Sequence, residues 1–283
     1  MFIFKSPAKI NWALYILKKR VDGYHDIVSL INTVDLYDTL IFEKSSSIEV
    51  HCNYPIRTEN NLVYKAAKLL QEYKQIKEGV KITVRKEIPI GAGLGGGSSN
   101  AAITMKALNE LWKLSLTLEE LNNLAMQIGS DVPFFLNTPL CLVEGKGDKI
   151  TPLKIEKTYH LLIVKPSFSI STRWAYESFD AESQLTENYE KINNNIWLLY
   201  KQLCEGVIDN KCLWNDLEQA VVKKYREIDF LKRKLLSSGA VASLMSGSGS
   251  TVYGVFESKE SAIAASKEFI GYWTRVVQTL VEE

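Results

Sequence analysis

The chain has 283 residues, of which 46% are hydrophobic and 24% charged, an average mixture for a globular protein of one large or two ordinary domains. Lysine and arginine number 34 against 33 acidic residues, which excludes a global positive field for nucleic acid or an anionic membrane. The four cysteines form no CxxC pair, which argues against a zinc or redox site, and no long apolar run indicates a leader or a membrane span. We expect a cytoplasmic protein with reduced thiols, in which local charge holds any anionic ligand.

The first part of the chain is predicted to be rich in β-structure. Apolar and β-branched residues recur in short runs, and Gly23 in RVDGYHD is a turn signal between the first two runs. The pattern predicts strands at residues 10–17, 27–36, 39–42, 48–52 and 80–88. A helix is expected at residues 61–73, between the last two strands.

Glycine is concentrated in PIGAGLGGGSSN, residues 89–100, between the last of these strands and a helix with apolar residues at Ala102, Met105 and Leu108. Ser98 or Ser99 is expected to cap that helix. Glycines let a backbone approach a ligand closely, and the unpaired N–H groups of a helix N-terminus favour anions. The loop therefore predicts a phosphate site. The alternative, a mobile linker, fits poorly with a loop that runs from a strand straight into a helix.

Three familiar phosphate-binding patterns nearly fit the loop. Gly91, Gly93 and Gly96 satisfy GxGxxG, but a dinucleotide-binding unit needs a second parallel strand, and another helix is predicted at 118–128 instead. In the Walker pattern Gly97 occupies the lysine position, and no HRD or DFG tripeptide of the protein kinases is present. A cation for the phosphates must therefore come from another segment.

The second part of the chain predicts a split α+β sandwich. A hairpin is expected in LCLVEGKGDKITPL, and the segment 152–158 is a plausible boundary between domains at residues 1–155 and 156–283. Beyond it the patterns predict a strand at 160–164, helices at 171–179, 187–203 and 214–236, a strand pair around MSGSGST, a helix at 259–272 and a strand at 275–280.

Two further segments offer a cation and a base. Lys9 in SPAKINW begins a strand and shares a face with Asn11, so that it could reach a site at the strand's end; the alternative is a solvated edge lysine. Asp131 in IGSDVPFF could accept a proton from a substrate hydroxyl during phosphoryl transfer. The alternative is a helix N-cap, because Asp shortly before Pro is common there.

These motifs together resemble the GHMP kinase superfamily. PIGAGLGGGSSN is similar to its signature loop, and SGSGST at 246–251 is similar to its C-terminal glycine motif. SPAKIN, DGYH at 22–25, ENNLVYKA at 59–66 and GSDVPFF resemble the branch that phosphorylates 4-diphosphocytidyl-2-C-methyl-D-erythritol. The resemblance implies an α+β, two-domain GHMP kinase fold, with a β-rich N-terminal domain that is ribosomal protein S5 domain 2-like and a ferredoxin-like C-terminal domain.

The resemblance also implies an activity: ATP-dependent, in-line transfer of a phosphoryl group to the 2-hydroxyl of that substrate in the non-mevalonate isoprenoid pathway, with Mg2+. The balanced charge and the lack of a long apolar run predict no nucleic-acid or membrane partner. The protein would be a monomer or homodimer. Open alternatives are another GHMP kinase, acting on homoserine or a mevalonate derivative, an NAD-linked oxidoreductase suggested by GAGLGG, and a catalytically silent nucleotide-binding module.

Site residues follow from the same resemblance. Lys9 and Asp131 would be the catalytic pair, and Ser99 is a candidate metal ligand. ATP would be bound by Asn61, Leu62, Val63, Lys86, Pro89, Ile90, Gly91, Ala92, Gly93, Leu94, Gly95, Gly96, Gly97, Ser98 and Ser99. The cytidyl substrate would be bound by Asn11, Tyr24, His25, Tyr176, Ser246, Gly247, Ser248 and Gly249. Ile31 departs from the family pattern, in which an aromatic residue often stacks on cytosine.

Overall fold

The structure, a computed structural model, describes residues 1–137, 139–182 and 188–282, which form two compact units that alternate along the chain. The first unit comprises Met1–Ala8, Leu36–Ile90 and Gly95–Thr138, and the second Lys9–Asp35, Gly91–Leu94 and Pro139–Glu283. Strands β1 (Phe2–Lys19) and β2 (His25–Ser45) contribute to both. The domain boundary expected at residues 155–156 stays a prediction.

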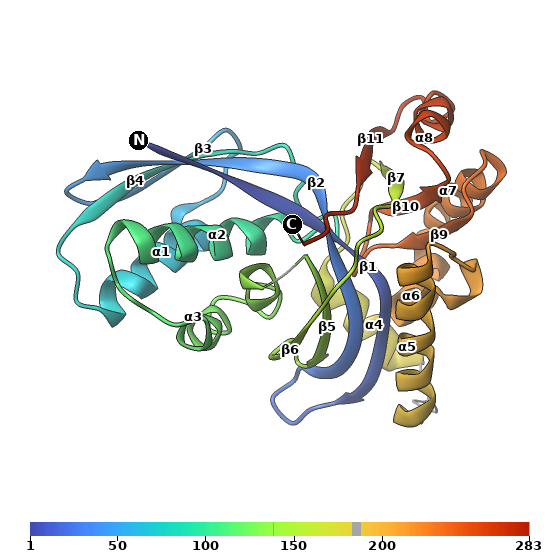
Figure 1. Ribbon diagram of the computed structural model, residues 1–283, viewed down its shortest axis with the longest axis horizontal. Coiled ribbons are helices and arrows are strands. Elements are labelled where there is room, and N and C mark those ends of the chain that lie inside the picture. The colour runs from blue at the N-terminus through green and yellow to red at the C-terminus, as the bar shows by residue number, and fades with distance from the viewer. Residues whose placement is uncertain (138, 183–187, 283) are drawn as a thin grey trace. The chain divides into compact units, whose positions relative to one another are not determined.

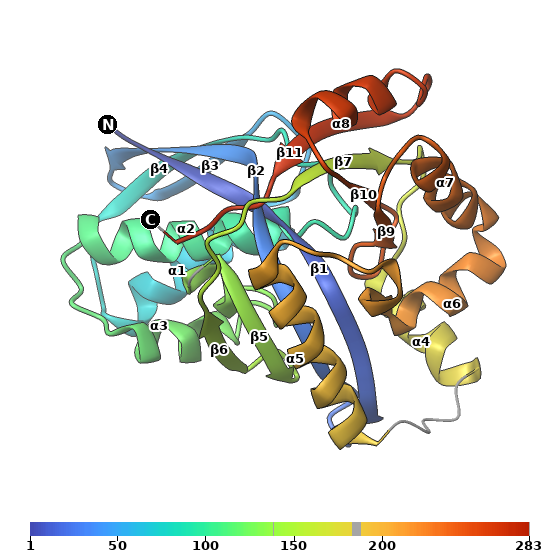
Figure 2. The same ribbon diagram turned by 45° about the vertical axis from the view of Figure 1, so that its right-hand side comes forward.

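The first unit packs helices on a short piece of sheet. The end of β2 pairs antiparallel with β4 (Gly79–Arg85), and β4 pairs parallel with β3 (Ile48–Cys52). Helices α1 (Leu62–Tyr73) and α2 (Gly96–Leu111) lie along one side of these strands (Figures 1 and 2). The remaining elements are η1 (Thr58–Asn60), α3 (Leu118–Ala125) and η2 (Pro133–Leu136).

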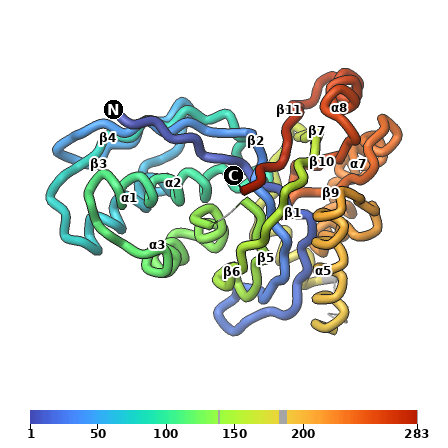
Figure 3. Tube along the Cα trace, viewed as in Figure 1, coloured from blue at the N-terminus to red at the C-terminus, as the bar shows by residue number. Residues whose placement is uncertain are grey.

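The second unit contains two groups of strands. The start of β2 pairs with β5 (Leu140–Gly145), which pairs with β6 (Lys149–Leu153), so that these strands run side by side in the trace of Figure 3. β8 (Trp214–Asn215) pairs parallel with β1. A separate antiparallel sheet has the order β11 (Trp273–Gln278), β7 (His160–Lys165), β10 (Val252–Phe256), β9 (Ala242–Met245).

Along the chain, helices come between β7 and β9 and between β10 and β11 of this separate sheet, which gives the expected ferredoxin-like arrangement. They are α4 (Thr172–Glu182), α5 (Tyr189–Glu205), η3 (Asn210–Cys212), α6 (Asp216–Lys224), α7 (Arg226–Ser237) and α8 (Lys259–Ser266). Buried residues such as Leu162, Leu231 and Met245 form one hydrophobic core between sheet and helices. Each fully buried leucine contributes about 1.5–3 kcal/mol, so this core holds the sheet that carries SGSGST.

Several predicted elements differ from those observed. The strands expected at 27–36 and 39–42 are one strand, β2, because its two lengths pair with β5 and β4 in turn. The helix expected at 214–236 begins instead with β8 and breaks at Tyr225, whose ring stacks on Phe168 at 4.8 Å. The predicted helix start at residue 187 lies outside the described residues. Within those described residues, no helix is long and apolar enough to cross a membrane.

Candidate nucleotide and substrate sites

Helix α2 begins inside the glycine loop. Its N-cap is Gly95, with φ 67°, and no side chain caps it, so the predicted cap by Ser98 or Ser99 is wrong. The helix starts earlier than expected, and glycines occupy its first two positions. The first intrahelical bond runs from Ser99 N–H to Gly95 C=O at 2.9 Å, which leaves the N–H groups of Gly96, Gly97 and Ser98 without an intrahelical acceptor. Such a terminus attracts anions.

The preceding part of the loop is held through its carbonyl groups. Gly91 and Gly93 have φ of 62° and 75°, values that favour glycine. Three consecutive carbonyls accept hydrogen bonds of 3.0 to 3.3 Å from within the second unit: Ala92 from Thr251 N–H, Gly93 from Ser246 Oγ and Leu94 from Lys9 N–H. Across a trans peptide the C=O and the following N–H point in opposite directions. The next N–H groups of the loop therefore point away from these donors.

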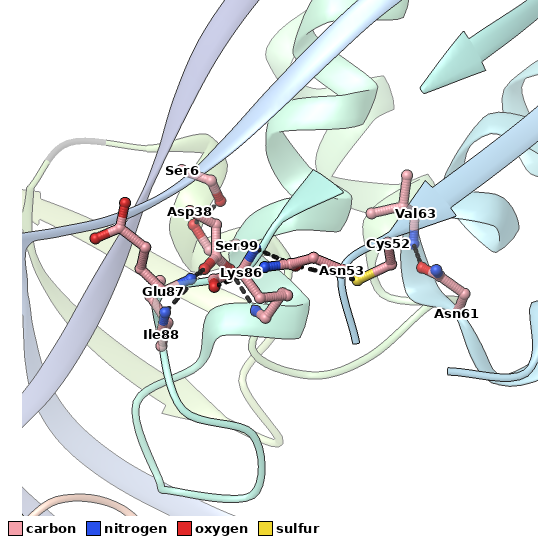
Figure 4. Close-up of polar contacts among 10 residues, drawn as sticks. All are labelled: Ser6, Asp38, Cys52, Asn53, Asn61, Val63, Lys86, Glu87, Ile88 and Ser99. Atoms are coloured by element: carbon pink, nitrogen blue, oxygen red, sulfur yellow. Dashed lines mark hydrogen bonds and ion pairs between the residues drawn. The ribbon is translucent and has the colours of Figure 1, made fainter. Parts of the chain in front are cut away.

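Lys86 lies beside the start of α2 and is held by a buried carboxylate, Asp38. Oδ2 of Asp38 pairs with Lys86 Nζ, and Oδ1 accepts the N–H groups of Glu87 at 2.8 Å and Ile88 at 2.9 Å (Figure 4). The Asp38 side chain is 0% and that of Lys86 8% exposed. A Cβ added to Gly96 would lie 3.1 Å from Lys86 Nζ. The ammonium group is thus fixed next to the N-terminus of α2.

The N-terminus of α1 meets the same region. Asn61 caps α1 by accepting the N–H of Val63 at 3.0 Å, so its predicted place at the ATP site coincides with a structural role. A Cβ added to Gly97 would lie 3.6 Å from Leu62 Cδ1. Four residues predicted to bind ATP, Leu62, Lys86, Gly96 and Gly97, are therefore brought together in the first unit.

Lys9 and Asn11 are buried on β1, 4% and 3% exposed. Lys9 Nζ donates to Asn11 Oδ1, and Asn11 Nδ2 donates to Ser29 Oγ at 2.8 Å. A Cβ added to Gly247 would lie 3.0 Å from Lys9 Nζ and 3.4 Å from Asn11 Oδ1. The lysine is therefore not a solvated edge residue, and it lies with predicted substrate-binding residues.

The SGSGST turn is held by side chains on several elements. Asn215 Nδ2 donates to the carbonyls of Met245 and Gly247, both at 2.8 Å, and its Oδ1 caps α6. Thr172 Oγ1 and Ser248 Oγ are 3.0 Å apart. Gly249 has φ 82°, and its N–H bonds to the carbonyl of Ser246 at 3.0 Å. Asn215 thus fixes a turn that the sequence analysis predicts to bind the substrate.

His25 begins β2 and lies among aromatic residues. Its Nε2 is 2.6 Å from Asp180 Oδ1, and its ring stacks on that of Tyr176 with a centroid separation of 4.9 Å and an interplanar angle of 26°. Asp180 Oδ2 pairs with Lys19 Nζ at 2.6 Å. The adjacent Tyr24 is 55% exposed. The predicted substrate residues His25 and Tyr176 are therefore in contact.

Two other predicted positions are less enclosed or less accessible than expected. Asp131 is exposed in the first unit, and the following helix η2 has no side-chain cap, so the N-cap alternative is wrong. Its pairing with Lys9, which belongs to the second unit, stays a prediction. Ile31 is 4% exposed within β2 and belongs to the hydrophobic core.

Asp38, Asp180 and Asn215 were not recognised from the sequence. Asp38 is 48 residues from Lys86, and Asp180 is 155 residues from His25. Neither separation forms a local motif. For Asn215, the only available signal was a capping residue inside a stretch read as continuous helix.

Side-chain oxygen atoms near the start of α2 are the candidate ligands of a metal ion. Among the described residues, no group of three His, Cys, Asp or Glu side chains could hold a metal ion. Ser99 Oγ accepts a hydrogen bond from Ser6 Oγ at 2.7 Å. In the described part of the chain Asn100 Oδ1 is buried and has no hydrogen-bond partner. A cation held mainly by phosphates and water, with one or two protein oxygens, fits this donor set.

Comparisons with known proteins show the family of the chain. The model of the GHMP kinases N terminal domain matches residues 61–138, and that of the GHMP kinases C terminal domain matches residues 199–273. A 4-diphosphocytidyl-2-C-methyl-D-erythritol kinase from Thermodesulfovibrio yellowstonii is 60% identical over 100% of this chain and 99% of its own. A kinase of the same name from Clostridioides difficile is 37% identical over 96% of this chain and 92% of its own.

Solved structures extend the likeness to three dimensions. A crystal structure of 4-(cytidine 5'-diphospho)-2C-methyl-D-erythritol kinase superposes with a TM-score of 0.82 at 30% identity, over 98% of this chain and 99% of that one. A homoserine kinase from Cytophaga hutchinsonii superposes with a TM-score of 0.75 at 20% identity, over 99% of this chain and 94% of that one. At this identity the likeness shows the fold alone. The chain therefore belongs to the 4-diphosphocytidyl-2-C-methyl-D-erythritol kinase family of the GHMP kinases.

Proposed function

We propose that this protein transfers the γ-phosphoryl group of ATP to the 2-hydroxyl of 4-diphosphocytidyl-2-C-methyl-D-erythritol, a step of the non-mevalonate isoprenoid pathway. The observation that carries the proposal is full-length identity of 60% to a kinase of that name. A homoserine kinase and a mevalonate kinase that resemble the chain are 20% and 16% identical to it, which supports a common fold and not a common substrate.

The proposed nucleotide site uses the start of α2. The N–H groups of Gly96, Gly97 and Ser98 would bind ATP phosphates, with Lys86 as a neighbouring cation. In a Walker motif a lysine would stand at the position of Gly97. The place of Lys86 beside the start of α2 supports it as the source of that positive charge. Mg2+ would be held by the phosphates together with Asn100 Oδ1 and Ser99, and it would neutralise phosphate charge when bound.

The residues proposed to act on the acceptor are Asp131 of the first unit and, in the second unit, Lys9 with the SGSGST turn. Asp131 would orient or deprotonate the 2-hydroxyl, and Lys9 would stabilise charge on the carboxylate and on the transferring group. The contact of Lys9 with Asn11 and Gly247 supports its place at the acceptor diphosphate. We also propose that residues 1–155 form the ATP-binding domain and residues 156–283 the substrate-side domain, since the two family models lie on either side of that boundary.

The test is ADP release from ATP with the cytidyl-diphosphate compound as acceptor, compared with homoserine and mevalonate. We expect turnover with the first acceptor only, and loss of turnover in folded Asp131→Asn and Lys9→Ala variants. Glu119→Gln, an exposed change on α3, is the matched control and should leave the rate unchanged. Turnover of homoserine or mevalonate in place of the cytidyl compound would replace the proposed substrate. A near-normal rate in either folded variant would remove that residue from the catalytic pair.

A further inference from the structure

The imidazole of His25 has two nitrogens in different situations. Nε2 lies 2.6 Å from Asp180 Oδ1, and within the described residues this is the only hydrogen bond recorded for the ring. The side chain is 5% exposed, and stacking on Tyr176 fixes the plane of the ring. The Nδ1 edge is therefore held in a defined direction while Asp180 engages the opposite nitrogen.

An ionised carboxylate has no proton to donate, so in that form Asp180 can only accept the hydrogen bond that it shares with the imidazole. Lys19 Nζ, 2.6 Å from the other carboxylate oxygen, supports that ionised form. Nε2 must then carry a proton, which in a neutral imidazole leaves Nδ1 as a bare acceptor. The tautomer of His25 is thus set by a residue on α4, which lies far away in the sequence.

We propose that Asp180 is a positioning residue that makes His25 selective for cytosine over uracil by fixing this tautomer. The inference rests on the proposed function and on the resemblance, which implies that His25 binds the cytidyl substrate; we place the base of that substrate at the Nδ1 edge of the ring. Position 4 of cytosine carries an amino group, which donates to a bare Nδ1. Uracil carries a carbonyl there, which meets that lone pair with its own. A site that accepts from an amino group rejects the carbonyl analogue because both acceptors are left unpaired.

Asp180→Asn is the informative change because the direction of its effect can be derived. Lys19 is a pure donor, so it draws the amide oxygen of the new side chain toward itself. The amide NH2 group then faces His25 and donates to Nε2, which moves the ring proton to Nδ1. The variant would present a donor to the base and would suit uracil.

The experiment measures kcat/KM for the cytidyl substrate and for its uridyl counterpart, with saturating ATP. In the wild type we expect preference for the cytidyl compound, and in Asp180→Asn a loss of that preference of at least about tenfold, as expected for one mismatched hydrogen bond to a base. Adding Lys19→Met lets the amide rotate and should restore part of the preference. Glu177→Gln, which alters an exposed ion pair on the same helix, should leave the preference unchanged.

A second readout follows the tautomer itself. The chain has three histidines, so the ring nitrogens of His25 can be assigned in 15N-labelled protein. The wild type should show a protonated Nε2 and a bare Nδ1, and Asp180→Asn the reverse. A purely structural role for Asp180 would lower kcat/KM equally for both substrates and leave the nitrogen shifts unchanged.

Three results would overturn the inference: a protonated Nδ1 in the wild type, an unchanged tautomer in Asp180→Asn, or an altered tautomer with unchanged preference between the substrates. These differ from failure of the proposed function, in which the wild type turns over neither compound. In that case the idea that His25 selects a base is overturned as well, while the 15N spectra still report whether Asp180 sets the tautomer.

Discussion

Asp38 in the first unit and Asp180 in the second each hold a nitrogen-bearing side chain, but the fold uses the two carboxylates differently. Asp38 is 0% exposed, and its oxygens are taken by Lys86 and by two backbone N–H groups. The Asp180 side chain is 25% exposed and holds His25 by one oxygen, with a salt bridge to Lys19 on the other. Asp38 therefore supports the framework from which Lys86 projects, whereas Asp180 governs the chemistry of a single ring. The two should be separable by experiment.

The largest expected difference is in stability. Asp38→Ala leaves a nearly buried ammonium and two N–H groups without their acceptor, which should lower the free energy of unfolding by about 3–5 kcal/mol. Asp180→Ala breaks a partly exposed cluster and should cost at most about 1 kcal/mol. Urea denaturation of both variants measures the difference. Equal losses would mean that Asp38 is no more part of the framework than Asp180.

Two glycines of the loop give the same contrast between framework and ligand site. A Cβ at Gly93 would lie 2.1 Å from the carbonyl oxygen of Ser246, and its φ is 75°, so Gly93→Ala should cost about 2–4 kcal/mol. A Cβ at Gly97 meets only Leu62 at 3.6 Å, and alanine in a helix is favourable by about 0.5–1 kcal/mol.

Gly97→Ala should therefore fold at least as well as the wild type while the new methyl group hinders the phosphates. We expect a raised KM for ATP, with an unchanged KM for the cytidyl substrate. Thermal unfolding and steady-state kinetics on the two alanine variants check this pair. A normal KM for ATP in Gly97→Ala would place the nucleotide away from the start of α2.

A smaller effect should show whether Lys86 contributes its charge to ATP binding or only stabilises the fold. Lys86→Met removes the cation but leaves the Asp38 carboxylate buried, whereas the double variant Lys86→Met/Asp38→Asn removes both charges and keeps an acceptor for Glu87 and Ile88. The double variant should recover stability lost by Lys86→Met, and both should raise the KM for ATP about tenfold, the worth of one charge-assisted contact of about 1.4 kcal/mol. Recovery of the KM together with stability would assign Lys86 a structural role only.

The sequence predicted those features that depend on neighbouring residues. The glycine loop between strand and helix, the helix that Asn61 caps and the hairpin of β5 and β6 all follow from local patterns. The cap by Ser98 or Ser99 was wrong because local pattern does not reveal that a helix can begin on two glycines. Tyr225, where α6 ends and α7 begins, stacks on Phe168, a tertiary contact that no local pattern predicts.

The candidate site divides in the same way. Lys9, Asn11 and Gly247 were assigned by resemblance, and the structure brings them together. Asp38 and Asp180 were missed because each acts through a partner that is distant in the sequence, and a single aspartate in a strand or helix has no spacing that marks it. Positioning residues of this kind require a tertiary structure to be identified.

The smallest expected effect concerns acid stability and tests the electrostatic half of the comparison. Burial raises the pKa of Asp180, but hydrogen bonds and charge from Lys19 and His25 outweigh it, so that the pKa lies below its ordinary value. A carboxylate with a lowered folded-state pKa stabilises the protein above the unfolded value of about 3.9, and this contribution is lost as the pH falls through the folded pKa. Asp180→Asn lacks the contribution, so the Tm difference between the two proteins should narrow as the pH falls below about 4. Thermal unfolding across that range measures it, with Glu177→Gln as the control on α4. A difference that widens below about pH 4 would mean that the carboxylate is not stabilised by its two partners, and the argument that Asp180 holds the imidazole as an ionised acceptor would fail with it.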